Sequence, residues 1–185
     1  MAFHVLIGVG ALLVLVIVVA VYYYNKIVQL DNRIENAWGQ IDVQLKRRAD
    51  LVPNLVETVK GYAAHEKTVL ENVTRARAAL LGAKSRQESM EAEGMLEQAL
   101  GRLFAVAEAY PDLKANRNFL QLQDELTHTE NKVSYARQHY NDAVLAYNNA
   151  VTTIPGNLFA GPMGKTRKAM LEIPQADREV PRVSF

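Results

Sequence analysis

Residues 118–153 read NFLQLQDELTHTENKVSYARQHYNDAVLAYNNAVTT, and this stretch decides the fold. Apolar or small residues recur along it in alternating steps of three and four, which is the spacing of one continuous helical seam. The seam consists of Phe119, Leu122, Leu126, Thr129, Val133, Ala136, Tyr140, Ala143, Tyr147, Ala150 and Ile154. At a rise of about 1.5 Å per residue, the stretch spans about 54 Å as a helix. A helix of this kind needs a long partner that covers its seam.

A second stripe of similar length runs from residue 27 to residue 62. Its apolar residues also recur every three or four positions, and Pro53 does not shift their phase. We therefore expect a bend at Pro53 rather than the end of the helix, with the loss of one backbone hydrogen bond. Equal lengths suit antiparallel partners, so the two stripes predict the long helices of one bundle.

Shorter stripes lie between these two helices. Residues 61–66 fit either a continuous helix or a turn, and periodicity does not decide between them. The polar residues 82–89 predict a loop, and Pro111 predicts the end of a helix. Asn118, with Gln121 three residues later, resembles a capping box that opens the last long helix. Prolines are frequent after Ile154, so we expect the helix to end there and an extended tail to follow.

The twenty residues from Val5 to Tyr24 include no lysine, arginine, aspartate or glutamate. Twenty helical residues rise about 30 Å, which is the thickness of the hydrocarbon layer of a membrane. Tyr22, Tyr23 and Tyr24 lie where an interfacial aromatic belt is expected. The alternative is a cleaved signal peptide, but that needs a basic start, which this chain lacks, and an apolar stretch of only about 7 to 15 residues. The sequence therefore predicts an uncleaved transmembrane helix.

The distribution of basic residues predicts the orientation of this span. No lysine or arginine precedes the span, whereas Lys26 and Arg33 follow it closely. The positive-inside rule then places the N-terminus outside and the rest of the chain in the cytoplasm. We therefore expect an all-α protein with a transmembrane anchor at residues 1–25. A long antiparallel bundle of three to four helices at residues 26–154 and an extended, proline-containing tail at residues 155–185 follow it.

The composition argues against several functions. The chain has 185 residues and a formal net charge of +1, so it offers no overall field that would attract a nucleic acid. It contains no cysteine, which excludes disulfides, thiol catalysis and cysteine-bound zinc. Glu125 and His128 have the spacing of a di-iron ligand pair, but such a site needs two copies and two further glutamates, so a solvated helix face is the favoured interpretation. Phosphate-binding loops and serine-nucleophile motifs are also missing, so we expect no enzyme, no cofactor and no metal.

Two features indicate contacts rather than chemistry. Arg48 falls within the apolar stripe of the first long helix, where its charge needs a partner, and Glu130 and Asp142 are the candidates. A pair with one of these carboxylates is the favoured interpretation, and the alternative is a polar device that fixes the helix register or receives another subunit. The tail carries apolar side chains, which in an extended segment usually bind the bundle, a neighbouring subunit or the membrane. Its candidate contact residues are Leu158, Phe159, Met170 and Phe185.

Two blocks of the sequence resemble the LemA family of bacterial membrane proteins. They are RRADLVPNLVETVKGYAAHE at residues 47–66 and AYPDLKANRNFLQLQDELTHTENKVSYARQHYNDAVLAYNN at residues 109–149. The resemblance implies a single N-terminal span followed by a long antiparallel helical bundle. Proteins of this family have no assigned enzymatic activity, so the resemblance implies none here. It also implies an association with bacterial envelope stress and a relationship to a component of magnetosome membranes.

From these features we expect a membrane-anchored helical scaffold or adaptor, acting in envelope stress or membrane organisation. It would self-associate at the bacterial inner membrane and engage envelope proteins. Its expected partners are the lipid bilayer, further copies of the chain as a homo-oligomer, and other envelope membrane proteins, but no nucleic acid. The alternative is a monomeric regulatory partner of a membrane protease.

Overall fold

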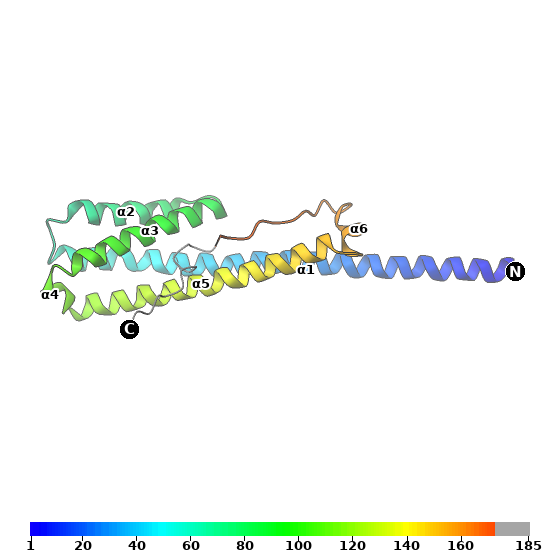
Figure 1. Ribbon diagram of the computed structural model, residues 1–185, viewed down its shortest axis with the longest axis horizontal. Coiled ribbons are helices and arrows are strands. Elements are labelled where there is room, and N and C mark those ends of the chain that lie inside the picture. The colour runs from blue at the N-terminus through cyan, green and yellow to red at the C-terminus, as the bar shows by residue number, and fades with distance from the viewer. Residues whose placement is uncertain (173–185) are drawn as a thin grey trace, which may run out of the picture. The chain divides into compact units, whose positions relative to one another are not determined.

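The computed structural model describes residues 1–172 (Figure 1). Within this range the chain forms six helices and no strand, which confirms the predicted all-α class. The chain divides into two compact units, and the long helices α1 (Ala2–Lys60) and α5 (Arg117–Thr152) contribute to both. Unit 1 consists of Met1–Gly39 with Ala136–Phe185, and unit 2 consists of Gln40–Tyr135.

The N-terminal helix α1 is a single helix of 59 residues, with Pro53 inside it as predicted. Its N-terminal part is long and apolar enough to cross a membrane, and none of its most apolar 18-residue window is buried within the chain. The helix ends at Lys60, after which Ala63 donates its backbone N–H to the carbonyl of Val59 at 2.8 Å. Residues 61–66 therefore form a turn, which decides between the two interpretations that periodicity left open.

Unit 2 contains helical segments of α1 and α5 together with α2 (Lys67–Gly82), α3 (Arg86–Ala107) and the short α4 (Pro111–Lys114). The chain reverses between α2 and α3, where the hydroxyl of Ser85 caps α3 by accepting the N–H of Glu88 at 3.2 Å. Arg77 joins α2 to α1 by donating from Nε to the carbonyl of Ala49 at 2.8 Å. The core of the unit includes Ile41, Leu45, Val52, Leu55, Val73, Leu96, Leu100, Leu103, Phe119 and Leu126.

Unit 1 packs the first part of α1 against the last part of α5 and the tail. The Trp38 ring meets the Tyr140 ring edge-on at 6.0 Å, whereas Tyr23, earlier on α1, meets Phe159 beyond the end of α5. The two helices therefore run antiparallel in this unit, as their equal lengths predicted. The buried side chains include Ile27, Leu30, Ile34, Ala37, Val144, Tyr147 and Val151.

The start of α5 differs from its prediction. The helix begins at Arg117, and its capping side chain is Asn116 rather than Asn118. The Oδ1 atom of Asn116 accepts the N–H groups of Asn118 at 2.9 Å and Phe119 at 3.1 Å. An asparagine two residues earlier thus satisfies the free N–H groups of the first turn.

The end of α5 also differs from its prediction. The helix ends at Thr152, and Ile154, which the seam placed in the core, is 81% exposed. The tail does not begin as an extended chain, because Gly156–Ala160 forms the short helix α6. Residues 165–172 then run without regular secondary structure.

Candidate functional site

The buried cation of unit 2 is Arg48 of α1, which is only 4% exposed. It interrupts the buried stripe between Leu45 and Val52. Its Nη1 atom donates a hydrogen bond of 2.9 Å to Oε1 of Glu93 on α3, and its Nη2 atom forms an ion pair with Glu130 on α5. Arg48 therefore connects three helices of this unit.

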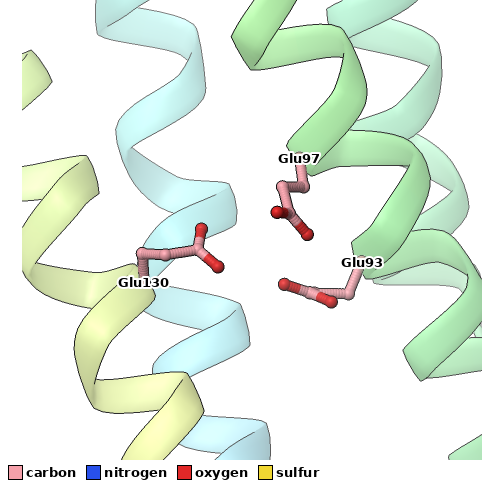
Figure 2. Close-up of side chains that lie close together, drawn as sticks. All are labelled: Glu93, Glu97 and Glu130. Atoms are coloured by element: carbon pink, nitrogen blue, oxygen red, sulfur yellow. The ribbon is translucent and has the colours of Figure 1, made fainter. Parts of the chain in front are cut away.

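Three carboxylates converge beside this guanidinium. Figure 2 shows Glu93 and Glu97 of α3 facing Glu130 of α5, and one carboxylate oxygen of each lies within 4.8 Å of the others. Carboxylate oxygens at such spacing are the ligands that hard cations prefer. Here, however, Arg48 places a positive charge in direct contact with two of the three. We interpret Arg48, Glu93 and Glu130 as a structural ion-pair network, in which the buried charges of Arg48 and Glu93 balance each other.

The sequence predicts one partner of Arg48 and misses the other. Glu130 was one of its two candidates, whereas Asp142, the second, is exposed on the part of α5 that belongs to unit 1. Glu93 is 1% exposed and was not predicted, although it extends the buried stripe of α3 one step before Leu96. The sequence offered one indication of this role, because Glu93 is an acidic residue on the face of α3 that is buried. A role of Arg48 in receiving another subunit stays a prediction.

In unit 1, two asparagines of α5 hold the main chain of the tail. Asn148 donates from its side chain to the carbonyl of Lys168 at 2.9 Å and accepts the Lys168 N–H at 2.8 Å. Asn141 makes the same pair of bonds with Leu171, at 3.0 Å and 2.8 Å. Asn148 is a polar residue, yet it is only 5% exposed, because both ends of its amide are hydrogen-bonded.

The spacing of these asparagines matches the spacing of the residues they bind. Asn141 and Asn148 lie seven residues apart on α5, which is a rise of about 10.5 Å. Lys168 and Leu171 lie three residues apart, and an extended chain covers about 10 Å in three steps. The two pairs of bonds therefore fit a straight tail that runs antiparallel to α5.

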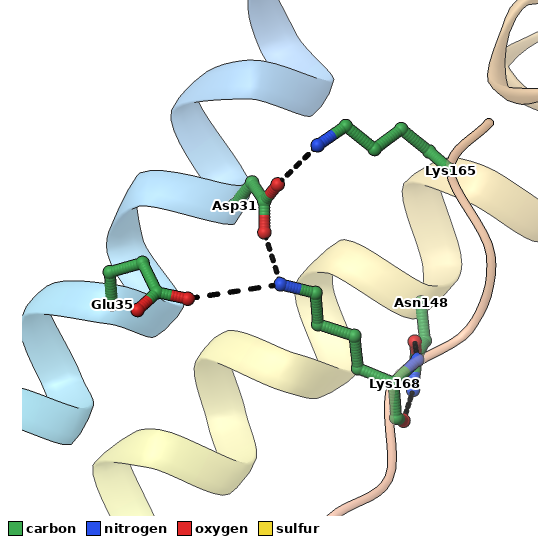
Figure 3. A network of polar contacts seen from close by, with 5 residues as sticks. All are labelled: Asp31, Glu35, Asn148, Lys165 and Lys168. Carbon is green, nitrogen blue, oxygen red and sulfur yellow. Dashed lines mark hydrogen bonds and ion pairs between the residues drawn. The ribbon is translucent and has the colours of Figure 1, made fainter. Parts of the chain in front are cut away.

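Asp31 of α1 binds lysine side chains of the same tail (Figure 3). Lys165 Nζ donates to Asp31 Oδ2 at 2.6 Å, Lys168 Nζ bonds to Oδ1, and Glu35 lies 4.0 Å from Lys168 Nζ. Burial alone raises the pKa of Asp31, but the hydrogen bonds and charges of the two lysines outweigh burial and hold it below its ordinary value of 3.8. The hydrogen bond to Asp31 raises the pKa of Lys165 above its ordinary 10.5.

The aromatic ring of Tyr147 completes this arrangement. Tyr147 is 1% exposed, and the Lys168 ammonium lies 5.3 Å from the centroid of its ring, within the range of a cation–π contact. Burial, followed by the charge of Asp31, raises the pKa of the Tyr147 hydroxyl above its ordinary 10.0. We call the whole arrangement the tail clamp, and it comprises Asp31, Asn141, Tyr147, Asn148, Lys165, Lys168 and Leu171.

The short helix α6 docks on α1 beside the end of the apolar run. The Phe159 ring stacks on the Tyr23 ring, with centroids 5.7 Å apart and planes 16° from parallel. Gly156 lies so close to its neighbours that a Cβ there would be 2.0 Å from the Ala150 carbonyl oxygen and 3.3 Å from the Tyr23 ring. A side chain at this position would therefore force α6 to shift.

The predicted anchor and tail contacts fall into two groups. Phe159 and Tyr23 are half-buried against each other. The exposed group, with 45% to 66% of each residue accessible, consists of Val5, Tyr22, Tyr24, Leu158 and Met170. Phe185 lies outside the described residues. Part of the tail thus packs on its own bundle, while some of its large apolar side chains stay uncovered by the described part of the chain.

Comparison with known proteins links this architecture to one family. A family model described as LemA family matches residues 37–185. Protein LemA of Metamycoplasma hominis is 24% identical over 174 residues, covering 90% of this chain and 80% of that protein. Magnetosome protein MamQ 2 of Paramagnetospirillum magneticum is 25% identical over 184 residues, covering 85% of this chain and 68% of that protein. Magnetosome protein MamQ of Magnetospirillum gryphiswaldense is 24% identical over 163 residues, covering 74% of this chain and 60% of that protein. None of these three relatives is named as an enzyme.

Proposed function

The chain belongs to the LemA family, and we propose that it is a membrane-anchored helical scaffold or adaptor that self-associates at the inner membrane of a bacterium and engages other envelope proteins. One observation carries the proposal: α1 continues without a break from the apolar run into the packed part of the chain. Ile27 and Ile34 are fully buried in unit 1 only a few residues after Tyr24. A helical connection of this kind holds the bundle at a fixed distance from the bilayer, which a flexible linker does not do.

Anchoring, rather than cleavage of a signal peptide, is supported by the same helix. The apolar window is exposed and long enough to span a bilayer, and the helix does not break between this window and the bundle. The proposed topology has the N-terminus outside and the bundle in the cytoplasm, on the positive-inside rule. Two relatives are named as magnetosome proteins, which supports a role in membrane organisation alongside the proposed role in envelope stress.

Cysteine labelling tests the topology, because the natural chain contains no cysteine. Phe3→Cys and Tyr135→Cys place one thiol on either side of the span, at residues that are 70% and 73% exposed. We expect a membrane-impermeant maleimide to label Phe3→Cys on intact spheroplasts and Tyr135→Cys only after lysis. The reverse pattern would place the bundle outside.

A binding role, rather than catalysis, is proposed on the basis of the polar groups. Charged and polar groups bind each other in the Arg48 network and in the tail clamp: Arg48 pairs with Glu93 and Glu130, and the tail binds Asp31 and Asn148. Charges and amides that pair within one chain are typical of structural contacts. The exposed apolar residues of the anchor and tail are typical of binding surfaces.

The mass of the detergent-solubilised full-length chain tests self-association. We expect light scattering to find a discrete assembly larger than one chain of 20.7 kDa after subtraction of the detergent. A chain that begins at Asn25 shows whether the span is needed for assembly. Persistence of the assembly without the span places the contacts in the bundle and tail, and its loss implicates the span. Monomers in both preparations would contradict a self-associating scaffold.

The second candidate is a monomeric regulatory partner of a membrane protease. It is favoured by the fact that both features expected at subunit contacts have partners inside this chain. Arg48 binds Glu93 and Glu130, and the tail binds Asn141 and Asn148. This candidate predicts a monomer that cross-links in the cell to a membrane protease in a one-to-one complex. Cross-linking that never captures a membrane protein would count against it.

A further inference from the structure

Two large aliphatic side chains lie uncovered where α5 gives way to α6. Ile154 is 81% exposed and Leu158 is 66% exposed, although Val151, just before them, is buried. Single exposed apolar residues are common on protein surfaces. These two, however, lie on a segment whose position is fixed, because Gly156 and Phe159 pack against Tyr23. Ile154 and Leu158 therefore form an exposed apolar edge at a fixed position.

The level of this edge along α1 is set by the stacking of Phe159 on Tyr23. Tyr23 lies near the end of the predicted span Val5–Tyr24, which is just long enough to cross the hydrocarbon layer. Figure 1 shows α6 against α1 where the uncovered N-terminal part of α1 begins. In the proposed anchored state, α6 therefore lies at the boundary between hydrocarbon and headgroups.

The charges of this segment fit the same position. Residues 143–164 contain no charged side chain, and the first one after them is Lys165. A turn reverses the chain before that lysine: Gly164 has φ +64°, and Lys165 donates its N–H to the Ala160 carbonyl at 3.0 Å. Lys165 then binds Asp31, eight residues or about 12 Å beyond Tyr23 on α1. The part of the tail at the Tyr23 level thus has no charge to desolvate, and the charges begin on its return path.

We propose that α6 and the turn before it form an interfacial element that inserts Ile154 and Leu158 into the headgroup boundary of the bilayer, at the level of Tyr23. The inference commits to lipid because the segment that carries both side chains packs on Tyr23, at the end of the span, through Gly156 and Phe159. It rests on the anchoring part of the proposed function. In this arrangement, the tail clamp holds α6 and the returning tail at a fixed level relative to the membrane surface.

Depth-dependent quenching of the full-length protein tests this inference. Single cysteines at Leu158 and, separately, at Ile154 are labelled with nitrobenzoxadiazole, and each protein is reconstituted into phosphatidylcholine–phosphatidylglycerol vesicles. Each vesicle sample contains lipid spin-labelled either near the headgroup or deep in the acyl chain. The matched surface control is Leu145→Cys, an exposed residue of α5 in unit 1, and the depth control is Val14→Cys within the span.

We expect the shallow spin label to quench the Leu158 and Ile154 labels at least twofold more than the deep one, and to leave the Leu145 label unchanged. The Val14 label should be quenched most by the deep spin label. A quenched Val14 label with unquenched labels at both Leu158 and Ile154 overturns the interfacial inference and leaves the anchoring intact. An unquenched Val14 label overturns the anchoring and the inference together. Equal quenching at Leu145 and Leu158 overturns the inference, because it attributes the signal to the dye.

Discussion

Replacing Arg48 by methionine should destabilise unit 2 strongly, because it removes the cation that pairs with the buried Glu93. Glu93 is 1% exposed, so its carboxylate would lose a hydrogen bond of 2.9 Å without gaining water. Glu130 is 37% exposed and can be hydrated, so it adds little to the loss. Removing one partner of a buried pair typically costs about 3–5 kcal/mol, a large part of the roughly 5–15 kcal/mol that holds a domain folded.

Urea unfolding of the detergent-solubilised full-length chain, followed by far-ultraviolet circular dichroism, measures this loss. Arg47→Met is the matched control, because Arg47 is the exposed neighbour of Arg48 and its loss should change the unfolding free energy by no more than about 0.5 kcal/mol. Adding Glu93→Gln to Arg48→Met removes the buried negative charge that Arg48 balances and should restore about 2 kcal/mol or more. Equal midpoints for Arg48→Met and Arg47→Met would refute the reasoning, and no recovery in the double variant would assign the loss to packing.

Three further predictions concern unit 1. Asn148→Ala removes two hydrogen bonds worth about 0.5–1.5 kcal/mol each. Amide hydrogen exchange of the tail peptide at residues 165–172 should therefore accelerate about 5- to 150-fold. Alanine at the exposed neighbour Asn149 should leave this exchange rate unchanged. Gly156→Ala should cost about 1–3 kcal/mol in thermal unfolding and loosen α6, because the new Cβ meets a backbone oxygen, whereas Gly161→Ala has open space and should be nearly neutral. The lowered pKa of Asp31 means that its contribution is present above about pH 3.8 and is lost as the pH falls through the lower folded-state pKa. The rate of amide hydrogen exchange in the tail, corrected for its intrinsic pH dependence, should therefore rise only below about pH 3.8. Asp31→Asn should abolish this rise.

Helical periodicity predicted the long elements because it is a local property of the chain. Leu126, Val133 and Tyr147 are buried as the seam requires, and Pro53 lies inside α1 because the apolar phase continues across it. The same reasoning failed at Ile154, where Pro155 follows and the helix has already ended. Periodicity therefore predicts which face of a helix is buried better than it predicts where the helix ends.

Contacts between distant segments were predicted only where a residue was out of place in its stripe. Arg48 was such a residue, so its need for a partner could be inferred, and Glu130 was among the candidates. Asn141 and Asn148 gave no comparable indication, because asparagine on a helix face is normally solvated and their partners are backbone atoms of the tail. A hydrogen bond to the main chain leaves no pattern in the side chains of its partner segment.

The seam nevertheless explains where the tail lies. Asn141 and Asn148 each directly follow a seam tyrosine, Tyr140 and Tyr147, so the two asparagines repeat with the same period of seven. Asp31, on the facing part of α1, reaches the same tail with its carboxylate. The tail therefore follows the edge of the α1–α5 contact in unit 1, and its register is fixed by the period of the helix rather than by its own side chains.

Backbone recognition leads to a prediction about where proline is tolerated. The tail contains four prolines, and none coincides with residues 168 and 171, whose N–H groups the asparagines need. They are Pro155, Pro162, Pro174 and Pro181. Leu171→Pro keeps an extended backbone but removes one donor, so exchange at residues 165–170 should accelerate about 2- to 12-fold. Leu171→Ala keeps the donor and should exchange like the natural chain. If both variants exchange faster than the natural chain by the same factor, the leucine side chain, and not the main chain, holds the tail.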